Sequence, residues 1–307
     1  MRQLLPQLND VSGNPCPEYG EVFDLLAAHD SSIAVNYEKF FECIKLLLDV
    51  QKDPLGKIVD VKISPKLNDA IFRLPFVLGK GVAKLLLSRT VKPDYLAKLE
   101  DFIPAQGRLK VFSLNYDCCL EEACRSAGID ITTGYDHHTG TWKPDVFDTN
   151  TKGINLYKLH GSLRWFHVRD NRTRSTLPDV SERIMELTPG QGPSNSTVGW
   201  ENPRLVLGPG SKMQADDPFF RLLAEFHRSL QQARVCVIIG YGHGDDHINT
   251  MLEQAQDAGI HLLDVNPPPY HYQGHLTPYT PLQLTAKAAL TNGRLASEIG
   301  KLLGAVT

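Results

Sequence analysis

Residues 234–249 read RVCVIIGYGHGDDHIN, and this stretch decides the fold. It begins with a near-continuous apolar run from Val235 to Ile239, passes through a glycine-rich polar turn and ends in residues that can start a helix. Strands without polar alternation are typical of parallel sheets that helices cover on both faces. Ligands of such sheets bind beyond the carboxyl ends of the strands. The stretch therefore predicts a strand, a ligand-facing turn and a helix of an α/β protein.

Three other segments carry a related pattern. VFSLNYD at 111–117 is followed by the helix-like CCLEEACRSAG, INLYKLHGSLRWF lies at 154–166, and IHLLDVNP lies at 260–267. Strands that alternate with helices in this way indicate a parallel sheet. We therefore predict an α/β fold, with a Rossmann-like, mostly parallel sheet and helices on both faces. The turns SLNYD, KLHGS, GYGHGDDHIN and DVNP are the expected positions of a site.

The other segments are mostly helical in pattern. Apolar residues at spacings of three and four predict helices over 17–29, 36–52, 76–90, 95–103 and 218–233. The polar stretch 169–200 predicts a long exposed loop with a short helix near 181–187, and RLVLGPG at 204–210 predicts a strand and turn.

These elements suggest how the chain is divided. We predict one discontinuous domain over 1–307, with its core in about 1–19 and 106–270. A helical lobe at 20–105 is inserted into this core, and 271–307 forms a C-terminal helical extension.

Composition excludes several classes of function. The chain has 32 basic and 35 acidic residues and a formal net charge of −3, so it has no general attraction to nucleic acid or to anionic membranes. No apolar run approaches the roughly 20 residues that span a bilayer, and the start of the chain lacks a signal-peptide core. We expect a cytoplasmic protein that does not bind membranes and shows no evident direct binding to nucleic acid, although the composition leaves a local basic groove open.

The six cysteines match no zinc site. None forms a CxxC pair, and their scatter fits no metal-ligand spacing. The adjacent pair His137 and His138 lacks an identifiable third ligand, so we interpret it as an exposed turn. His247 is interpreted as packing locally at the start of a helix. We therefore predict no metal site.

Each turn motif, taken alone, has a purely structural explanation. Asn and Asp after a strand often cap the next helix because they accept hydrogen bonds from free backbone amides. His-Gly-Ser is compatible with an ordinary turn. The glycines of GYGHGDDHIN fit a tight turn, although open amides at the start of a helix can also hold phosphate.

Together, the motifs resemble a known family. The chain is similar to the sirtuin-like NAD-consuming family in the order of four motifs. These are Ser113-Leu114-Asn115-Tyr116-Asp117, LHGS at 159–162, GYGHGDDHIN at 240–249 and Val265-Asn266. The nearest pattern is that of the bacterial branch found in anti-phage defence systems, whose common forms are T-x-N-Y-D, L-H-G-S and G-Y-S-x-x-D-x-H-I-N. Gly242 stands where serine is usual. The resemblance covers roughly residues 110–267.

The resemblance implies an NAD site and roles for its residues. Asn115 would orient the ribose or the attacking water, and His160 would accept a proton, as imidazole can near neutral pH. Asp117 and its backbone would hold the nicotinamide carboxamide, and Asn266 would meet the adenine ribose. The NAD-binding residues carried over from the motifs are Ser113, Tyr116, Asp117, Gly161, Ser162, Gly240, Tyr241, Gly242, Asp245, Asn249 and Asn266.

Two departures from the family bear on function. The family opens with a strand and a G-A-G-x-S loop that holds the pyrophosphate, and nothing in this chain matches it; LPQLNDV at 5–11 resembles the segment that follows that loop. We therefore expect the chain to lack the N-terminal glycine loop. Deacylase sirtuins carry a four-cysteine zinc module after the His-Gly motif, and residues 161–235 contain no cysteine. No zinc is expected.

The resemblance favours an NAD hydrolase that converts NAD to nicotinamide and ADP-ribose and acts as a defence-associated, NAD-depleting effector. The alternative is a non-catalytic module that binds or senses NAD or ADP-ribose, which the absent glycine loop favours. A protein deacylase or ADP-ribosyltransferase is the third reading, disfavoured by the absent zinc module. The expected partners are NAD and either another copy of the chain or a defence partner protein.

Overall fold

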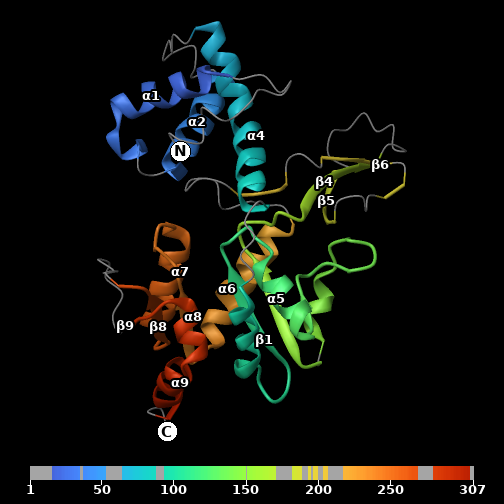
Figure 1. Cartoon of the computed structure of the whole chain (residues 1–307), viewed down its shortest axis with the longest axis vertical. Helices are drawn as coiled ribbons and strands as arrows, with labels where there is room; N and C mark the ends of the chain where they lie inside the picture. Colours follow the sequence, from blue (N-terminus) through green and yellow to red (C-terminus); the bar gives the residue numbers. More distant parts are fainter. Residues whose placement is uncertain are drawn as a thin grey trace. The chain divides into compact units, whose positions relative to one another are not determined.

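The protein is described from a computed structural model (Figure 1). The structure describes residues 16–34, 37–52, 64–87, 93–149, 151–170, 182–188, 193–194, 196–199, 203–206, 217–268 and 279–304. Contacts divide the chain into two units, one of residues 1–90 with 160–213 and the other of residues 91–159 with 214–307. Each unit is described by itself. The predicted division into core, lobe and extension stays a prediction.

The second unit contains a first parallel sheet, in the strand order β1–β3–β2. Its strands are β1 (Arg108–Ser113), β2 (Ile131–Thr132) and β3 (Gly153–Lys158). β3 is buried along its whole length. Ile154 packs with Cys124 of helix α5 (Cys119–Ala127) and with Leu99 of the 3₁₀ helix η3 (Asp94–Phe102). On the opposite face, Phe112 lies against Phe226 of helix α6 (Phe219–Gln232).

A second parallel sheet in the same unit has the order β7–β8–β9. Its strands are β7 (Val235–Ile239), β8 (His261–Asn266) and β9 (Tyr279–Gln283). Leu263, Val265 and Leu282 share a buried cluster with residues of α8 (Ala286–Thr291) and α9 (Arg294–Gly304). Figure 1 shows α8 beside β8. Helix α7 (Asp246–Asp257) follows β7 and contacts β8 and α6.

These contacts confirm the predicted fold class. The strands are parallel, and helices flank the sheets. The prediction of one sheet differs in detail, because the parallel strands form two sheets. Among the described residues, β1 pairs with β3 alone and β7 with β8 alone.

The other unit combines helices with a small antiparallel sheet. Tyr19, Phe40 and Leu74 are fully buried in a core shared by α1 (Glu18–His29), α2 (Tyr37–Lys52) and α4 (Pro65–Leu87). A short 3₁₀ helix, η2 (Ser31–Ala34), contacts α1 and α2. The sheet has the order β5–β4–β6, with β4 at Trp165–Asp170, β5 at Glu182–Glu186 and β6 at Ser196–Val198.

Some local predictions were wrong or incomplete. The short helix predicted near 181–187 is the strand β5, because antiparallel pairing with β4 buries Ile184 and Met185. The helix predicted over 76–90 begins at Pro65 and ends at Leu87. The segment predicted as a helix over 95–103 is the 3₁₀ helix η3, and β9 was not predicted. LPQLNDV at 5–11 and residues 207–210 of RLVLGPG lie outside the described residues.

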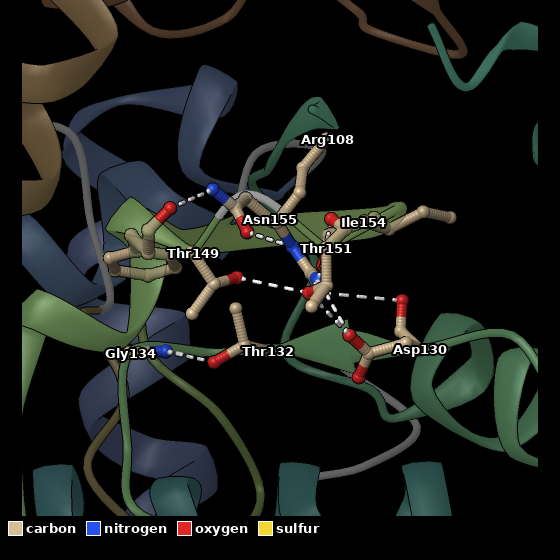
Figure 2. A network of polar contacts seen from close by, with 9 residues as sticks. Arg108, Asp130, Thr132, Gly134, Thr149, Thr151, Ile154 and Asn155 are labelled. Carbon is tan, nitrogen blue, oxygen red and sulfur yellow. Dashed lines mark hydrogen bonds and ion pairs between the residues drawn. The ribbon is translucent and has the colours of Figure 1, made fainter. Parts of the chain in front are cut away.

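An arginine clamp ties the amino ends of β1 and β3 together (Figure 2). Arg108, whose side chain is 3% exposed, donates through Nε to Asn155 Oδ1 at 2.6 Å and through Nη1 to Thr151 Oγ1 at 2.9 Å. It also pairs with Asp130 at 2.5 Å and donates to the Ile154 carbonyl at 3.0 Å. The planar guanidinium can make several hydrogen bonds at once, so one side chain joins both strands and the segment before β2.

Candidate active site

The residues predicted for NAD binding lie at strand ends or in the segments that follow them. Residues 114–117 follow β1, residues 240–249 follow β7, and Asn266 is the last residue of β8. His160, Gly161 and Ser162 follow β3 but belong to the other unit. The structure therefore describes the surroundings of each group, and the approach of His160 to Asn115 stays a prediction.

The turn after β1 holds Asn115 by its backbone. Asn115 N donates to Ser113 Oγ at 3.1 Å, and Asp117 Oδ1 accepts from Cys119 N at 2.9 Å. Asn115 is exposed, and its side chain makes no hydrogen bond among the described residues. Its amide is therefore available to a ligand. Tyr116 lies in the same turn and is half-buried.

Cys119 lies next to this turn but is poorly suited to act as a nucleophile. Burial and a hydrogen bond to Asp117 raise the pKa of the Cys119 thiol to about 12. The thiolate is the reactive form of cysteine, so at neutral pH this sulfur is protonated. Among the described residues, no group of three or more His, Cys, Asp or Glu side chains could hold a metal ion.

A buried ion pair supports the same turn from β3. Lys158 Nζ donates to the carbonyl oxygen of Asp117 and lies 3.3 Å from Glu121 Oε1. The two side chains are only 2% and 6% exposed, and Glu121 Oε2 has no hydrogen-bond partner among the described residues. Sequence reasoning missed both residues. The available signal was a lysine at the end of an otherwise apolar strand, because lysine is rarely buried without a partner.

The glycine-rich loop after β7 is closed by its own side chains. Tyr241 Oη donates to Asn249 Oδ1 at 3.0 Å, and Asn249 Nδ2 donates to the His243 carbonyl at 2.8 Å. Asp245 is buried, and its Oδ1 accepts from His247 N at 3.1 Å, which caps α7. The carboxylate thus also interacts favourably with the positive end of the helix dipole.

The glycines of this loop differ in what they require. Gly240 has φ +67°, a left-handed conformation that favours glycine. A Cβ atom at Gly242 would meet nothing within 4 Å, and its φ is not left-handed. Packing therefore does not require glycine at position 242, and the serine that is usual in the family would fit there.

Beneath the loop, three polar side chains form a buried chain. His243 Nε2 lies 3.2 Å from Asp264 Oδ2, and Asn266 Nδ2 donates to Asp264 Oδ1 at 2.8 Å and to the Tyr241 carbonyl at 3.0 Å. His243 and Asp264 are 3% and 0% exposed at their side chains. Neither was predicted as a site residue; the available signal was an aspartate inside the apolar run IHLLDVN.

In the other unit, the His-Gly-Ser turn is held by the segment at 203–206. His160 O accepts from Val206 N at 2.8 Å, and Gly161 pairs with Leu205. Gly161 has φ +91°, and a Cβ there would lie 2.2 Å from the Arg204 carbonyl oxygen, so only glycine fits. His160 is 6% exposed and Ser162 is fully buried.

Polar turns at the carboxyl ends of parallel strands are where α/β proteins of this architecture bind their ligands. The chain matches the SIR2-like domain family over residues 109–273, which include every predicted site residue. The protein belongs to the SIR2-like family. This membership suggests that it binds or uses NAD.

Solved structures show a distant likeness. A mutant Sir2 homologue in complex with ADP-ribose is 16% identical, with a TM-score of 0.44 and 78% of this chain and 79% of that chain covered. A Sir2 homologue in complex with NAD is 17% identical, with a TM-score of 0.42 and coverage of 78% and 77%. Sir2Tm bound to a propionylated peptide is 12% identical, with a TM-score of 0.40 and coverage of 72% and 79%.

No match was found among curated proteins. Family membership therefore depends on the sequence match. Within the described residues, every helix is too short or too polar to span a bilayer.

Proposed function

We propose that the protein is an NAD glycohydrolase that cleaves NAD to nicotinamide and ADP-ribose. The observation that carries the proposal is the SIR2-like match over 109–273, which contains the Asn115 turn, the His160 turn and the loop at 240–249 in family order. The exposed amide of Asn115, held by the backbone of its turn, supports this reading.

The reaction breaks the bond between the nicotinamide nitrogen and C1′ of the ribose, and a water oxygen forms a new bond to C1′. The transition state resembles an oxocarbenium ion, as in glycoside hydrolysis. Nicotinamide leaves as a neutral molecule, so no strong acid is needed. The water gives up a proton, which His160 would accept.

The remaining residues would position the substrate. Asn115 would orient the ribose or the water, and Asp117 with its backbone would hold the carboxamide. Lys158 fixes the carbonyl of Asp117 and so supports this turn. Positioning contributes strongly to rate, because a held water attacks as if in an intramolecular reaction.

We further propose that the activity depletes NAD as part of a defence response, as the resemblance to the defence-associated branch implies. We also propose the site residues named above, the division of the chain into core, lobe and extension, and a partner that is either a second copy of the chain or a defence protein. NAD depletion can be tested by expressing the protein in cells and measuring the extracted nucleotides. The NAD level should fall with the wild-type protein and not with His160→Ala.

The decisive experiment measures fluorescence on cleavage of etheno-NAD by the purified chain. We expect His160→Ala to lower kcat by about 10²- to 10⁴-fold, the usual contribution of a positioned proton-transfer group. Asn115→Ala should lower kcat by about 10²-fold, because the ribose or the water is no longer oriented. His138→Ala, an exposed histidine in the 136–139 turn, is the matched control and should keep full activity.

Turnover that survives both substitutions would contradict the mechanism. If the wild-type chain binds NAD in calorimetry but does not cleave it, the non-catalytic binding module would replace the hydrolase. Binding of neither NAD nor ADP-ribose would rule out both.

A further inference from the structure

Helix α4 exposes a row of apolar and basic side chains. The row, which we call the α4 row, follows the helix at intervals of four and finally three residues and consists of Phe72, Phe76, Lys80, Lys84 and Leu87. Residues at these intervals lie on one side of a helix. Phe72 is 67% exposed and Leu87 is 71% exposed. Large apolar side chains that gather on an exposed surface mark an interaction site.

The opposite side of α4 is already buried. Ile71, Leu74 and Leu78 are at most 2% exposed and pack in the core that α4 shares with α1 and α2. A helix that buries one apolar stripe usually presents polar residues on its other side. The α4 row departs from this pattern, so its apolar side chains need a surface other than this core.

The α4 row is also positively charged. The charged residues that follow Asp69 in α4 are all basic, namely Arg73, Lys80 and Lys84. Arg73 pairs with Asp69 at 3.0 Å, whereas Lys80 and Lys84 are exposed within the row itself. The row therefore suits a surface that combines apolar and acidic side chains.

Helix α1 has such a surface. Its exposed residues, which we call the α1 face, are Glu21, Asp24, Leu25, Ala28 and His29. Leu25 is 48% exposed, and Glu21 lies one turn before it on the same side of the helix. The helix contains three acidic residues and neither lysine nor arginine. Because α1 and α4 pack through their buried residues, the α1 face and the α4 row both point away from the shared core.

We propose that the α4 row binds the α1 face of a second copy of the chain, in a two-fold symmetric dimer. Both surfaces belong to one unit, so each copy supplies one of each, and in a two-fold interface every contact occurs twice. The apolar side chains of the row pack against the partner's Leu25, and its lysines lie opposite the partner's Glu21 and the partner's Asp24. A second copy is thus the partner of this surface.

An anionic membrane is the main competing surface. Basic helices that expose phenylalanine and leucine can lie at a lipid interface. The acidic α1 face belongs to the same three-helix core, however, and anionic headgroups would repel it. A membrane would also leave Leu25 uncovered, as would an unrelated acidic protein. A second copy covers both surfaces and pairs their opposite charges.

The test measures the mass of the full chain by sedimentation velocity over a range of concentrations, without NAD. The wild-type chain should form a dimer. Phe72→Glu should raise the Kd of this dimer by about 10²- to 10³-fold, because an aromatic anchor is lost from both halves of the interface. Phe220→Glu is the matched control, since Phe220 is a phenylalanine of α6 that is 58% exposed in the other unit. It should dimerise like the wild type.

A charge exchange tests the pairing of the two surfaces. One variant carries Lys80→Glu with Lys84→Glu, and the other carries Glu21→Lys with Asp24→Lys. Each variant alone places like charges opposite one another at both contacts and should dimerise at least about tenfold more weakly than the wild type. An equimolar mixture restores opposite charges at both contacts and should form a mixed dimer.

A wild-type chain that stays monomeric at every concentration overturns the proposal. So does a folded Phe72→Glu variant that dimerises as tightly as Phe220→Glu, or a mixture of the two charge variants that does not associate. A monomeric wild-type chain that sediments with phosphatidylserine vesicles would identify a membrane surface and overturn the second copy. Since these measurements contain no NAD, their outcome is independent of the proposed hydrolase.

Discussion

The buried pair of Lys158 and Glu121 gives the sharpest test of how the fold supports the site. Glu121→Gln removes the carboxylate from a lysine that is 2% exposed. Removing one partner of a buried ion pair costs about 3–5 kcal/mol. In a protein of this size, 1 kcal/mol shifts Tm by about 2–4 °C, so we expect Tm to fall by about 6–20 °C. Thermal unfolding followed by circular dichroism measures this shift.

A double variant separates stability from positioning. Replacing a buried pair by apolar residues of similar size is often neutral or stabilising by about 1–4 kcal/mol. The double variant Lys158→Met with Glu121→Leu should therefore recover most of the lost stability. It should still turn over etheno-NAD more slowly, because the hydrogen bond from Lys158 to the Asp117 carbonyl is gone.

The control is another Lys–Glu pair in the same unit. Lys110 and Glu225 are 2.8 Å apart, but the lysine side chain is 37% exposed. Lys110→Met should change stability by about 1 kcal/mol or less, as for other exposed pairs. The reasoning is refuted if Glu121→Gln lowers Tm no more than Lys110→Met does, or if the double variant is as unstable as Glu121→Gln.

Three further predictions test other parts of the molecule. Arg108→Lys should lower the free energy of unfolding by about 1.5–3 kcal/mol for each hydrogen bond of Arg108 that is lost, because lysine lacks the planar guanidinium group with its several donors. An unchanged midpoint of urea unfolding would show that these hydrogen bonds do not stabilise the fold. Gly161→Ala should destabilise by about 1–3 kcal/mol, since φ is +91° and the Cβ would meet the Arg204 carbonyl; a variant as stable as wild type would mean that the turn relaxes freely. Hydrogen bonding from Lys39 lowers the pKa of Asp30 to about 2, below the unfolded value of about 3.9. The stabilisation is therefore present above about pH 4 and lost as the pH falls toward 2. Asp30→Asn should lower Tm at pH 6, and the Tm values of the variant and the wild type should converge near pH 2. A Tm difference that stays constant across this pH range would contradict the assignment.

The sequence predicted the elements whose burial is local and continuous. The apolar runs of β1, β3, β7 and β8 and the amphipathic stretch of α6 all correspond to observed elements. β5 was predicted as a helix because the apolar residues in its five-residue stretch follow neither a helical nor a strand periodicity clearly. Its strand conformation is determined by pairing with β4. β9 was missed because Pro281 interrupts the strand signal; proline removes a ladder donor and is usually confined to edges. Among the described strands, β9 lies at the edge of its sheet.

The site was predictable only as far as neighbouring residues form motifs. The turns at 113–117 and 240–249 were recognised because their residues are contiguous. Lys158 and Glu121 are 37 residues apart, and His243 and Asp264 are 21 residues apart. Such pairs become visible only when the fold brings a helix or a loop against a neighbouring strand. A charged residue inside an apolar strand is the sequence signal that a partner exists, but it does not say which one.

The arginine clamp has a consequence for folding kinetics. The acceptors of Arg108 at Asp130, Thr151 and Asn155 lie 22, 43 and 47 residues along the chain. None of these bonds can form before the intervening chain has closed into a loop, and long closures are slow. Interactions that form after the transition state slow unfolding without speeding folding. If the clamp forms only after the transition state, Arg108→Lys should therefore speed unfolding and leave the folding rate unchanged.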